Sequence, residues 1–144
     1  MIMIKVKKLH PQAKLPKKST DGSACFDIYT LEDIYLTNNT LIKARTGLAF
    51  EIPKGYFVET RMRSGLATKG VIIPNAPTTI DSDYRGEVLV PLFNLFGEKL
   101  MFFGAGSRIA QCRVVKETEA TFKICDNLSD TERGSGGFGS TGTA

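Results

Sequence analysis

Histidine and paired cysteines are nearly absent from this chain. His10 is the single histidine, which excludes a histidine-based metal site. The three cysteines, Cys25, Cys112 and Cys125, lie far apart and form no C-x-x-C pair. An odd, scattered set of this kind argues against a disulfide framework or a zinc site and favours a reducing compartment.

Targeting and membrane signals are missing as well. The N-terminal stretch has no long apolar run followed by a small-residue cleavage site, so no secretion signal is visible. No segment approaches the length of a membrane span. We therefore expect a cytoplasmic protein that makes no membrane contact.

The composition is that of an ordinary folded domain. The 144 residues are 42% hydrophobic and 24% charged, with a formal net charge of +4, which is enough apolar material for one core. Six lysines fall within the first eighteen residues: Lys5, Lys7, Lys8, Lys14, Lys17 and Lys18. Such a run usually marks a solvated surface, so no nucleic-acid partner is expected, and the charge equally suits a polyanionic small ligand.

The pattern along the chain predicts an all-β sandwich or barrel, because short apolar segments alternate with turn residues. One short helix is expected at Ser64–Lys69, with Ser64 as its cap and Gly70 at its end. The predicted strands are Ile2–Leu9, Phe26–Leu31, Thr40–Thr46, Gly47–Ile52, Tyr56–Met62, Val71–Ile73, Glu87–Leu95, Lys99–Phe103, Ser107–Lys116 and Thr121–Ile124.

The composition changes after Asn127. Residues 133–142 read RGSGGFGSTG and hold five of the fourteen glycines, a composition that cannot bury enough apolar surface to fold alone. We expect one β-domain over residues 1–127 and a flexible, Gly-rich C-terminal tail over residues 128–144.

Three segments could carry chemistry. In Arg63-Ser64-Gly65-Leu66-Ala67, a helix start beside an arginine suits phosphate oxygens, although the same residues also make an ordinary capped helix. The segment from Asn75 to Glu87 is predicted to be a hairpin whose tip holds a small planar ligand, and its Asp81 could deprotonate a water near phosphorus. A plain polar turn is the alternative there.

The third segment is the tail. Its glycines let backbone approach phosphates, and the lone Phe138 has no core to join and could stack on a ligand. A disordered, linker-like terminus is the alternative.

Together these stretches resemble the trimeric dUTPase family in content and order. The matching segments are Ala24-Cys25-Phe26-Asp27, Arg63–Ala67, Asn75–Glu87, Gly106-Ser107-Arg108-Ile109-Ala110-Gln111 and Arg133–Gly142. The resemblance implies a jelly-roll-like β-barrel that assembles as a homotrimer with active sites shared between subunits. It also implies an Mg²⁺-dependent dUTP diphosphatase, which hydrolyses dUTP to dUMP and pyrophosphate by water attack on the α-phosphate. Such an enzyme lowers dUTP and supplies dUMP for thymidylate synthesis.

The resemblance also assigns roles. Asp81 matches the aspartate that activates water, and Tyr84 matches the tyrosine under the deoxyribose. No direct protein ligand for Mg²⁺ is implied, because the triphosphate and water hold the ion, and Asp27 matches a residue of the hydration shell or of structural support. The remaining substrate-binding positions implied are Asn75, Thr79, Ile80 and Leu89 for uracil, Arg63, Ser64, Gly65 and Gln111 for phosphate, and Arg133, Phe138, Gly139, Ser140 and Thr141 in the tail.

Four departures from the family pattern, Cys25, Met62, Thr78 and Ser107, leave every group assigned to catalysis in place. Three rival functions stay open: a relative of the dCTP deaminases, a non-catalytic nucleotide-sensing or regulatory protein on the same fold, and an RNA-binding protein that uses its tail. The hairpin from asparagine to tyrosine favours the hydrolase over the deaminase. The single Arg-Gly pair of the tail is too little for RNA binding.

Overall fold

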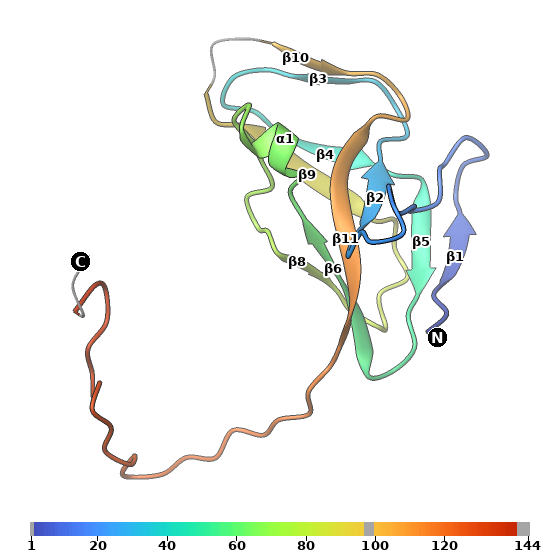
Figure 1. Cartoon of the computed structure of the whole chain (residues 1–144). Helices are drawn as coiled ribbons and strands as arrows, with labels where there is room; N and C mark the ends of the chain where they lie inside the picture. Colours follow the sequence, from blue (N-terminus) through green and yellow to red (C-terminus); the bar gives the residue numbers. More distant parts are fainter. Residues whose placement is uncertain (1, 97–99, 141–144) are drawn as a thin grey trace.

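The computed structural model describes residues 2–96 and 100–140, which form antiparallel strands and one short helix (Figure 1). In chain order, the elements are β1 (Lys5–Lys8), β2 (Phe26–Tyr29), β3 (Ile34–Leu36), β4 (Leu41–Arg45), β5 (Leu48–Glu51), β6 (Tyr56–Arg61), α1 (Ser64–Ala67), β7 (Val71–Ile72), β8 (Thr78–Ile80), β9 (Leu89–Asn94), β10 (Met101–Phe103) and β11 (Arg108–Lys116). The predicted all-β fold with one helix is confirmed.

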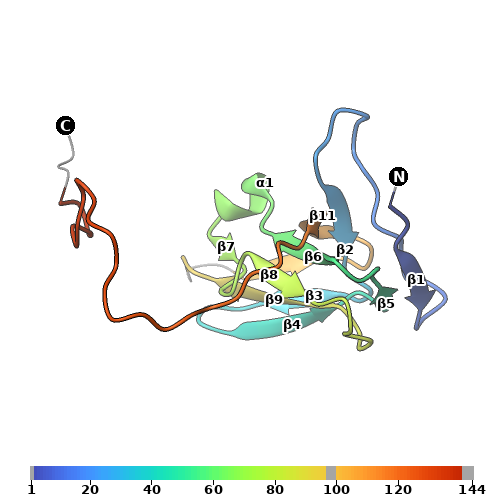
Figure 2. The same ribbon diagram turned by 90° about the horizontal axis from the view of Figure 1, so that it is seen from below.

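Two sheets form the layers of the body. A four-stranded sheet in the order β2-β11-β6-β8 lies over a three-stranded sheet in the order β4-β9-β7, and the pairs β1-β5 and β10-β3 complete the body (Figure 2). Apolar side chains alternate along the strands: in β9, Val90 and Leu92 are buried whereas Leu89 is exposed. This period of two places one face of each strand on the core.

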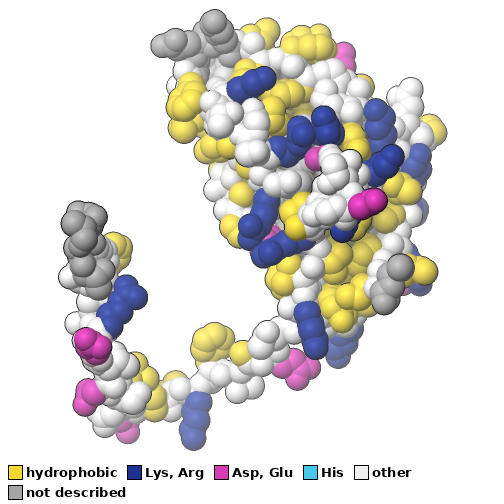
Figure 3. Space-filling model, viewed as in Figure 1, with side chains coloured by type: hydrophobic (Ala, Val, Ile, Leu, Met, Phe, Trp, Pro, Cys, Tyr) yellow, Lys and Arg dark blue, Asp and Glu magenta, His cyan; other side chains and the backbone are white. Residues whose placement is uncertain are grey.

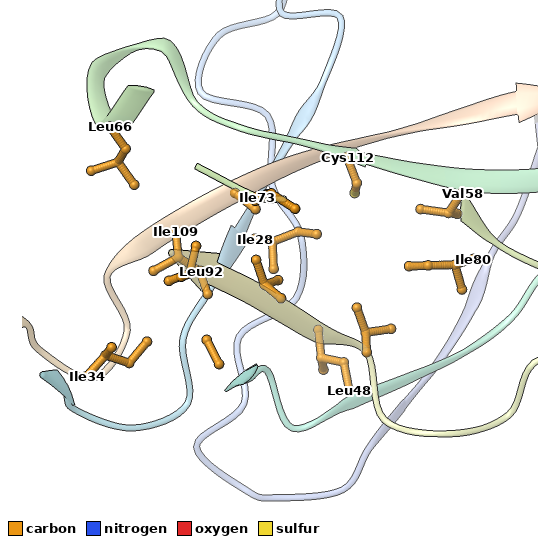
Figure 4. Packing of buried hydrophobic residues seen from close by; sticks show 14 of the residues in the cluster. Ile28, Ile34, Leu48, Val58, Leu66, Ile73, Ile80, Leu92, Ile109 and Cys112 are labelled. Carbon is orange, nitrogen blue, oxygen red and sulfur yellow. The ribbon is translucent and has the colours of Figure 1, made fainter. Parts of the chain in front are cut away.

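The core lies between the layers. Ile28, Val58, Ile80, Ile109 and Cys112 from the four-stranded sheet meet side chains that include Leu92 and Leu48 (Figure 4). Ile109 and Leu92 have no measurable exposure, and each contributes about 1.5–3 kcal/mol through burial.

The predicted strands correspond closely to the observed ones, with three errors. The predicted strand Thr121–Ile124 is wrong, because this segment has no strand pairing and Phe122 and Ile124 are almost fully exposed. The strands β3 and β8 were not predicted. Lys99, the first residue of another predicted strand, lies outside the described residues.

The helix begins at Ser64 as predicted, but its end and its N-cap differ from the prediction. It ends at Ala67 instead of Lys69, and its N-cap is Arg63 in an extended conformation, without a side-chain capping hydrogen bond. Ser64 is therefore the first helical residue and not the cap. Gly70 still closes the segment, since its N–H donates to the Ala67 carbonyl at 2.9 Å.

The last strand ends at Lys116, and no regular element follows it among the described residues up to Ser140. This segment runs away from the body (Figure 1). The division at residue 127 stays a prediction. In the part of the chain that the structure describes, no helix has the length and apolar character to cross a membrane.

Candidate active site

A concave pocket lies between the segment that carries β8 and the start of β9. Five of its lining residues, Thr79, Ile80, Asp81, Tyr84 and Leu89, are among the predicted site residues. Thr78, Glu87 and Val88 complete the lining. The pocket therefore joins the predicted base and the predicted sugar-contacting ring in one cavity.

The segment from Asn75 to Glu87 is not the predicted hairpin. Strand β8 pairs with β6, whereas β9 pairs with β4 and β7, so the segment connects the two sheets. Asn75 lies at the base of the first arm, where its side-chain carbonyl accepts a hydrogen bond from the Thr78 hydroxyl at 3.0 Å. The tip is a turn in which the Tyr84 N–H donates to the Asp81 carbonyl at 3.2 Å.

The second arm of the pocket consists of Glu87, Val88 and Leu89. It is anchored on the corner between β4 and β5. The buried Thr46 hydroxyl donates to the Val88 carbonyl at 2.7 Å, and the Val88 N–H donates to the Leu48 carbonyl at 2.8 Å. The Glu87 carboxylate accepts from the Gly47 N–H at 2.8 Å and pairs with Arg45 Nε at 3.1 Å. Sequence reasoning missed this anchor, because nothing in the 40 or so residues between the two segments indicates that they meet.

The predicted phosphate-contacting residues gather on a second surface. The Arg63 Nε lies 3.2 Å from one oxygen of the buried Asp27 carboxylate, and the other oxygen accepts from the Ser19 hydroxyl at 2.7 Å and lies 3.4 Å from Arg108. Both oxygens of Asp27 are thus engaged. This arrangement holds the Arg63 side chain beside β11. Of the two roles expected for Asp27, the hydration shell of Mg²⁺ and structural support, it favours structural support.

Gln111 belongs to the same surface. It pairs with Asp27 across one ladder and with Arg61 across the other, and its amide nitrogen donates to the Met62 carbonyl at 3.3 Å. Lysine and arginine side chains are grouped over this face of the body (Figure 3). A cluster of cations on a rigid sheet is suited to binding a polyanion.

Within one chain, Asp81 in the pocket and Arg63 on the second surface lie far apart. Ile80 pairs with Val58, so the next residue, Asp81, lies beside Phe57. Phe57 is six residues before Arg63, which follows the end of β6 in an extended conformation. At the rise of a β-strand this separation is about 20 Å. The pocket lining includes neither Arg63 nor Gln111.

The tail residues form a third group. Phe138 is fully exposed, and Arg133 Nε donates to the Gly136 carbonyl at 2.9 Å within the tail itself. Gly139 and Ser140 follow in the same stretch, and Thr141 lies outside the described residues. The tail runs well away from the β-strands of its own chain, including β8 (Figure 1).

Among the described residues, ion pairing lowers the pKa of two carboxyl groups and burial raises the pKa of one thiol. Hydrogen bonds from Arg61 and Arg113 hold the pKa of Glu59 below its ordinary value, with distances of 2.6 and 3.1 Å. Pairing with Lys5 lowers the pKa of Glu51. Burial raises the pKa of the Cys112 thiol to about 12, so this cysteine is not a nucleophile at neutral pH.

No cluster of three or more His, Cys, Asp or Glu side chains that could hold a metal ion occurs among residues 2–96 and 100–140. A site in which the ligand itself supplies the oxygens for a magnesium ion is compatible with this donor set, because Mg²⁺ commonly keeps several waters and binds through phosphates.

Comparison with known proteins gives a consistent result. The dUTPase family model matches residues 11–142. The deoxyuridine 5'-triphosphate nucleotidohydrolase of Helicobacter pylori is 43% identical over 142 residues, covering 98% of this chain and 97% of that protein. The protein of the same name from Zymomonas mobilis is 45% identical over 144 residues, with 98% of each chain covered.

Solved structures share the fold. The dUTPase of Staphylococcus bacteriophage 80alpha, solved with dUpNHpp, superposes with a TM-score of 0.84 at 25% identity and covers 98% of this chain and 99% of that one. A dUTPase variant from phage phi11 of S. aureus, described with a structural Mg(II) ion, gives a TM-score of 0.76 at 20% identity, with 88% and 98% coverage.

Proposed function

The chain belongs to the dUTPase family and hydrolyses dUTP to dUMP and pyrophosphate, and we propose that Asp81 is the base that activates the attacking water. The observation that supports this assignment most directly is the pocket that Asp81 shares with Tyr84. A carboxylate in the wall of this pocket could accept a proton from a water beside the α-phosphate.

The two arms of the pocket are proposed to hold the nucleoside. Backbone groups of Thr79, Ile80 and Leu89, with Asn75 at the base, would read the uracil edge. The Tyr84 ring would lie under the deoxyribose, where it would crowd out a ribose 2′-hydroxyl. Uracil and cytosine present opposite donors and acceptors at N3 and position 4. A pocket that pairs with uracil would therefore leave buried groups unpaired with cytosine.

We propose that Arg63, Ser64, Gly65 and Gln111 bind the phosphates, and that they do so on a neighbouring copy of the chain. The separation of about 20 Å between Asp81 and Arg63 within one chain supports a shared site. A homotrimer, as the family resemblance implies, would bring the nucleoside pocket of one copy to the phosphate surface of the next.

The tail is proposed to close over the bound nucleotide. Arg133, Gly139, Ser140 and Thr141 would contact phosphate, and Phe138 would stack on uracil. The full exposure of Phe138, with no core contact of its own, supports a role that begins only when a ligand is present. Closure of this kind would exclude bulk water from the phosphates.

The proposed cofactor is Mg²⁺, held by the triphosphate and water and not by direct protein ligands. When bound, it would offset negative charge on the phosphates. Arg63, kept in place by Asp27, would add a fixed positive charge from the protein side. A cytoplasmic location is also proposed, and the three free thiols support it.

The test is pyrophosphate release from each deoxynucleoside triphosphate with Mg²⁺, measured for the wild type and for Asp81→Asn. We expect release from dUTP alone, with a loss of at least about a hundredfold in kcat for the variant. Asp83→Asn is the matched control, because Asp83 is an exposed aspartate two residues away that lies outside the pocket lining. Wild-type turnover that survives in Asp81→Asn would refute the assignment of the base, and tight dUTP binding without any turnover would favour the nucleotide-sensing function.

A further inference from the structure

The Tyr84 ring lies directly against Gly86. A Cβ atom added to Gly86 would overlap the Tyr84 hydroxyl and stand 2.6 Å from its Cζ atom. The hydroxyl also donates to the Glu87 carbonyl at 3.0 Å, so the ring is folded back over Gly86 and Glu87. The backbone of Gly86 is not in the left-handed region, so its conformation does not require glycine. The close approach of the Tyr84 ring does.

Glu87 fixes the backbone on which the ring rests. Its carboxylate is held by the Gly47 N–H at 2.8 Å and by Arg45 Nε at 3.1 Å. The Gly47 corner is itself rigid, because Gly47 has φ +68° and an added Cβ would stand 2.9 Å from Ala13 Cβ. The position of the Tyr84 hydroxyl is therefore tied, through Glu87, to a corner of the body that has little room to move.

We propose that Gly86 and Glu87 are positioning residues: they hold the Tyr84 ring in the position where it excludes a ribose 2′-hydroxyl. The inference rests on the proposed function, in which Tyr84 lies under the deoxyribose. Gly86 supplies the space that lets the ring fold back, and Glu87 supplies the fixed carbonyl that the phenol binds. Neither residue needs to touch the reacting phosphate.

The critical variant is Gly86→Ala. The atoms that a new Cβ would meet belong to the end of the Tyr84 side chain. We therefore expect the ring to rotate away while the backbone conformation stays the same. We expect the ratio of kcat/KM for dUTP to that for UTP to fall by about tenfold or more, since a displaced ring no longer rejects the extra hydroxyl. Gly22→Ala is the matched control, because an added Cβ there meets nothing within 4 Å.

A coupling test separates positioning from general damage. In a Tyr84→Ala background, where the ring is gone, Gly86→Ala should change the dUTP-to-UTP ratio by less than about twofold. Loss of folding would lower both kcat/KM values together and leave their ratio unchanged, and circular dichroism of each variant would reveal it.

Two results would overturn the proposal. An unchanged ratio in folded Gly86→Ala would show that the ring does not depend on this glycine, while leaving dUTP hydrolysis and Asp81 as they stand. An equally large loss of discrimination with Tyr84 already removed would show that Gly86 acts by another route. A wild type that hydrolyses UTP as fast as dUTP would instead refute the role of Tyr84 in the proposed function.

Discussion

The anchor of the nucleoside pocket on the β4–β5 corner yields a quantitative prediction for Thr46→Val. The Thr46 side chain is 1% exposed, its hydroxyl donates to the Val88 carbonyl at 2.7 Å, and it accepts from the Leu48 N–H at 3.2 Å. Valine keeps the shape and removes both hydrogen bonds. The Val88 carbonyl and the Leu48 N–H both lose their partner. Each such buried group costs about 1–3 kcal/mol, so we expect a loss of about 2–6 kcal/mol in the free energy of unfolding.

The same substitution should weaken substrate binding. The Val88 carbonyl lies on the arm that lines the pocket, so a looser arm should raise KM for dUTP more than it lowers kcat. The assay is urea unfolding at a fixed protein concentration, because the stability of an oligomer depends on that concentration, followed by steady-state kinetics. Thr40→Val is the control: its hydroxyl donates to the Thr37 carbonyl at 2.9 Å on the exposed surface, and its loss should cost under about 0.5 kcal/mol. A loss below about 0.5 kcal/mol for Thr46→Val, with KM unchanged, would refute the anchor.

Two further predictions concern the tail and the charged sheet face. Truncation after Glu132 removes Arg133 and Phe138, which make no described contact with the body; thermal unfolding should hardly change, while kcat/KM for dUTP should fall by about a hundredfold or more. A large drop in melting temperature would contradict this reasoning, and Phe138→Ala alone should give a smaller loss of activity. The lowered pKa of Glu59 means that its pairing with Arg61 and Arg113 stabilises the fold above the ordinary value of 4.5 and that this contribution is lost as the pH falls below it. Glu59→Gln should therefore be less stable than the wild type by about 1 kcal/mol at pH 7, and this gap should shrink as the pH falls below 4.5. A gap that stays the same on acidification, measured by urea midpoints, would exclude this ion pairing as the cause.

Local pattern was sufficient for much of this protein. The alternation of apolar and polar residues predicted the all-β class and most strands, because the period of two reports directly which face of a strand is buried. Asp81 and Tyr84 were placed in one site because they lie three residues apart on a turn-rich segment, and residues so close in sequence remain close in any fold. The order of five motifs was enough to identify the family.

Long-range pairing was beyond the reach of the sequence. No local signal says that the Thr46–Gly47 corner meets Glu87 and Val88, or that Arg63 pairs with Asp27. These contacts depend on the register between strands distant in the chain. The same limit explains the wrong hairpin: turn residues were recognised, but the ladder partners of β8 and β9 are β6 and β4. The strand predicted at Thr121–Ile124 has the right alternation and no neighbouring backbone to pair with.

Sequence by itself therefore determined the fold class and the family, and it named the candidate site residues. Tertiary structure alone decided that these residues are divided between the pocket that holds Asp81, a surface whose Arg63 lies about 20 Å from Asp81, and a tail that leaves the body. The physical reason is that side-chain chemistry is a property of each residue, whereas the distance between two residues is set by how the strands between them pair and pack.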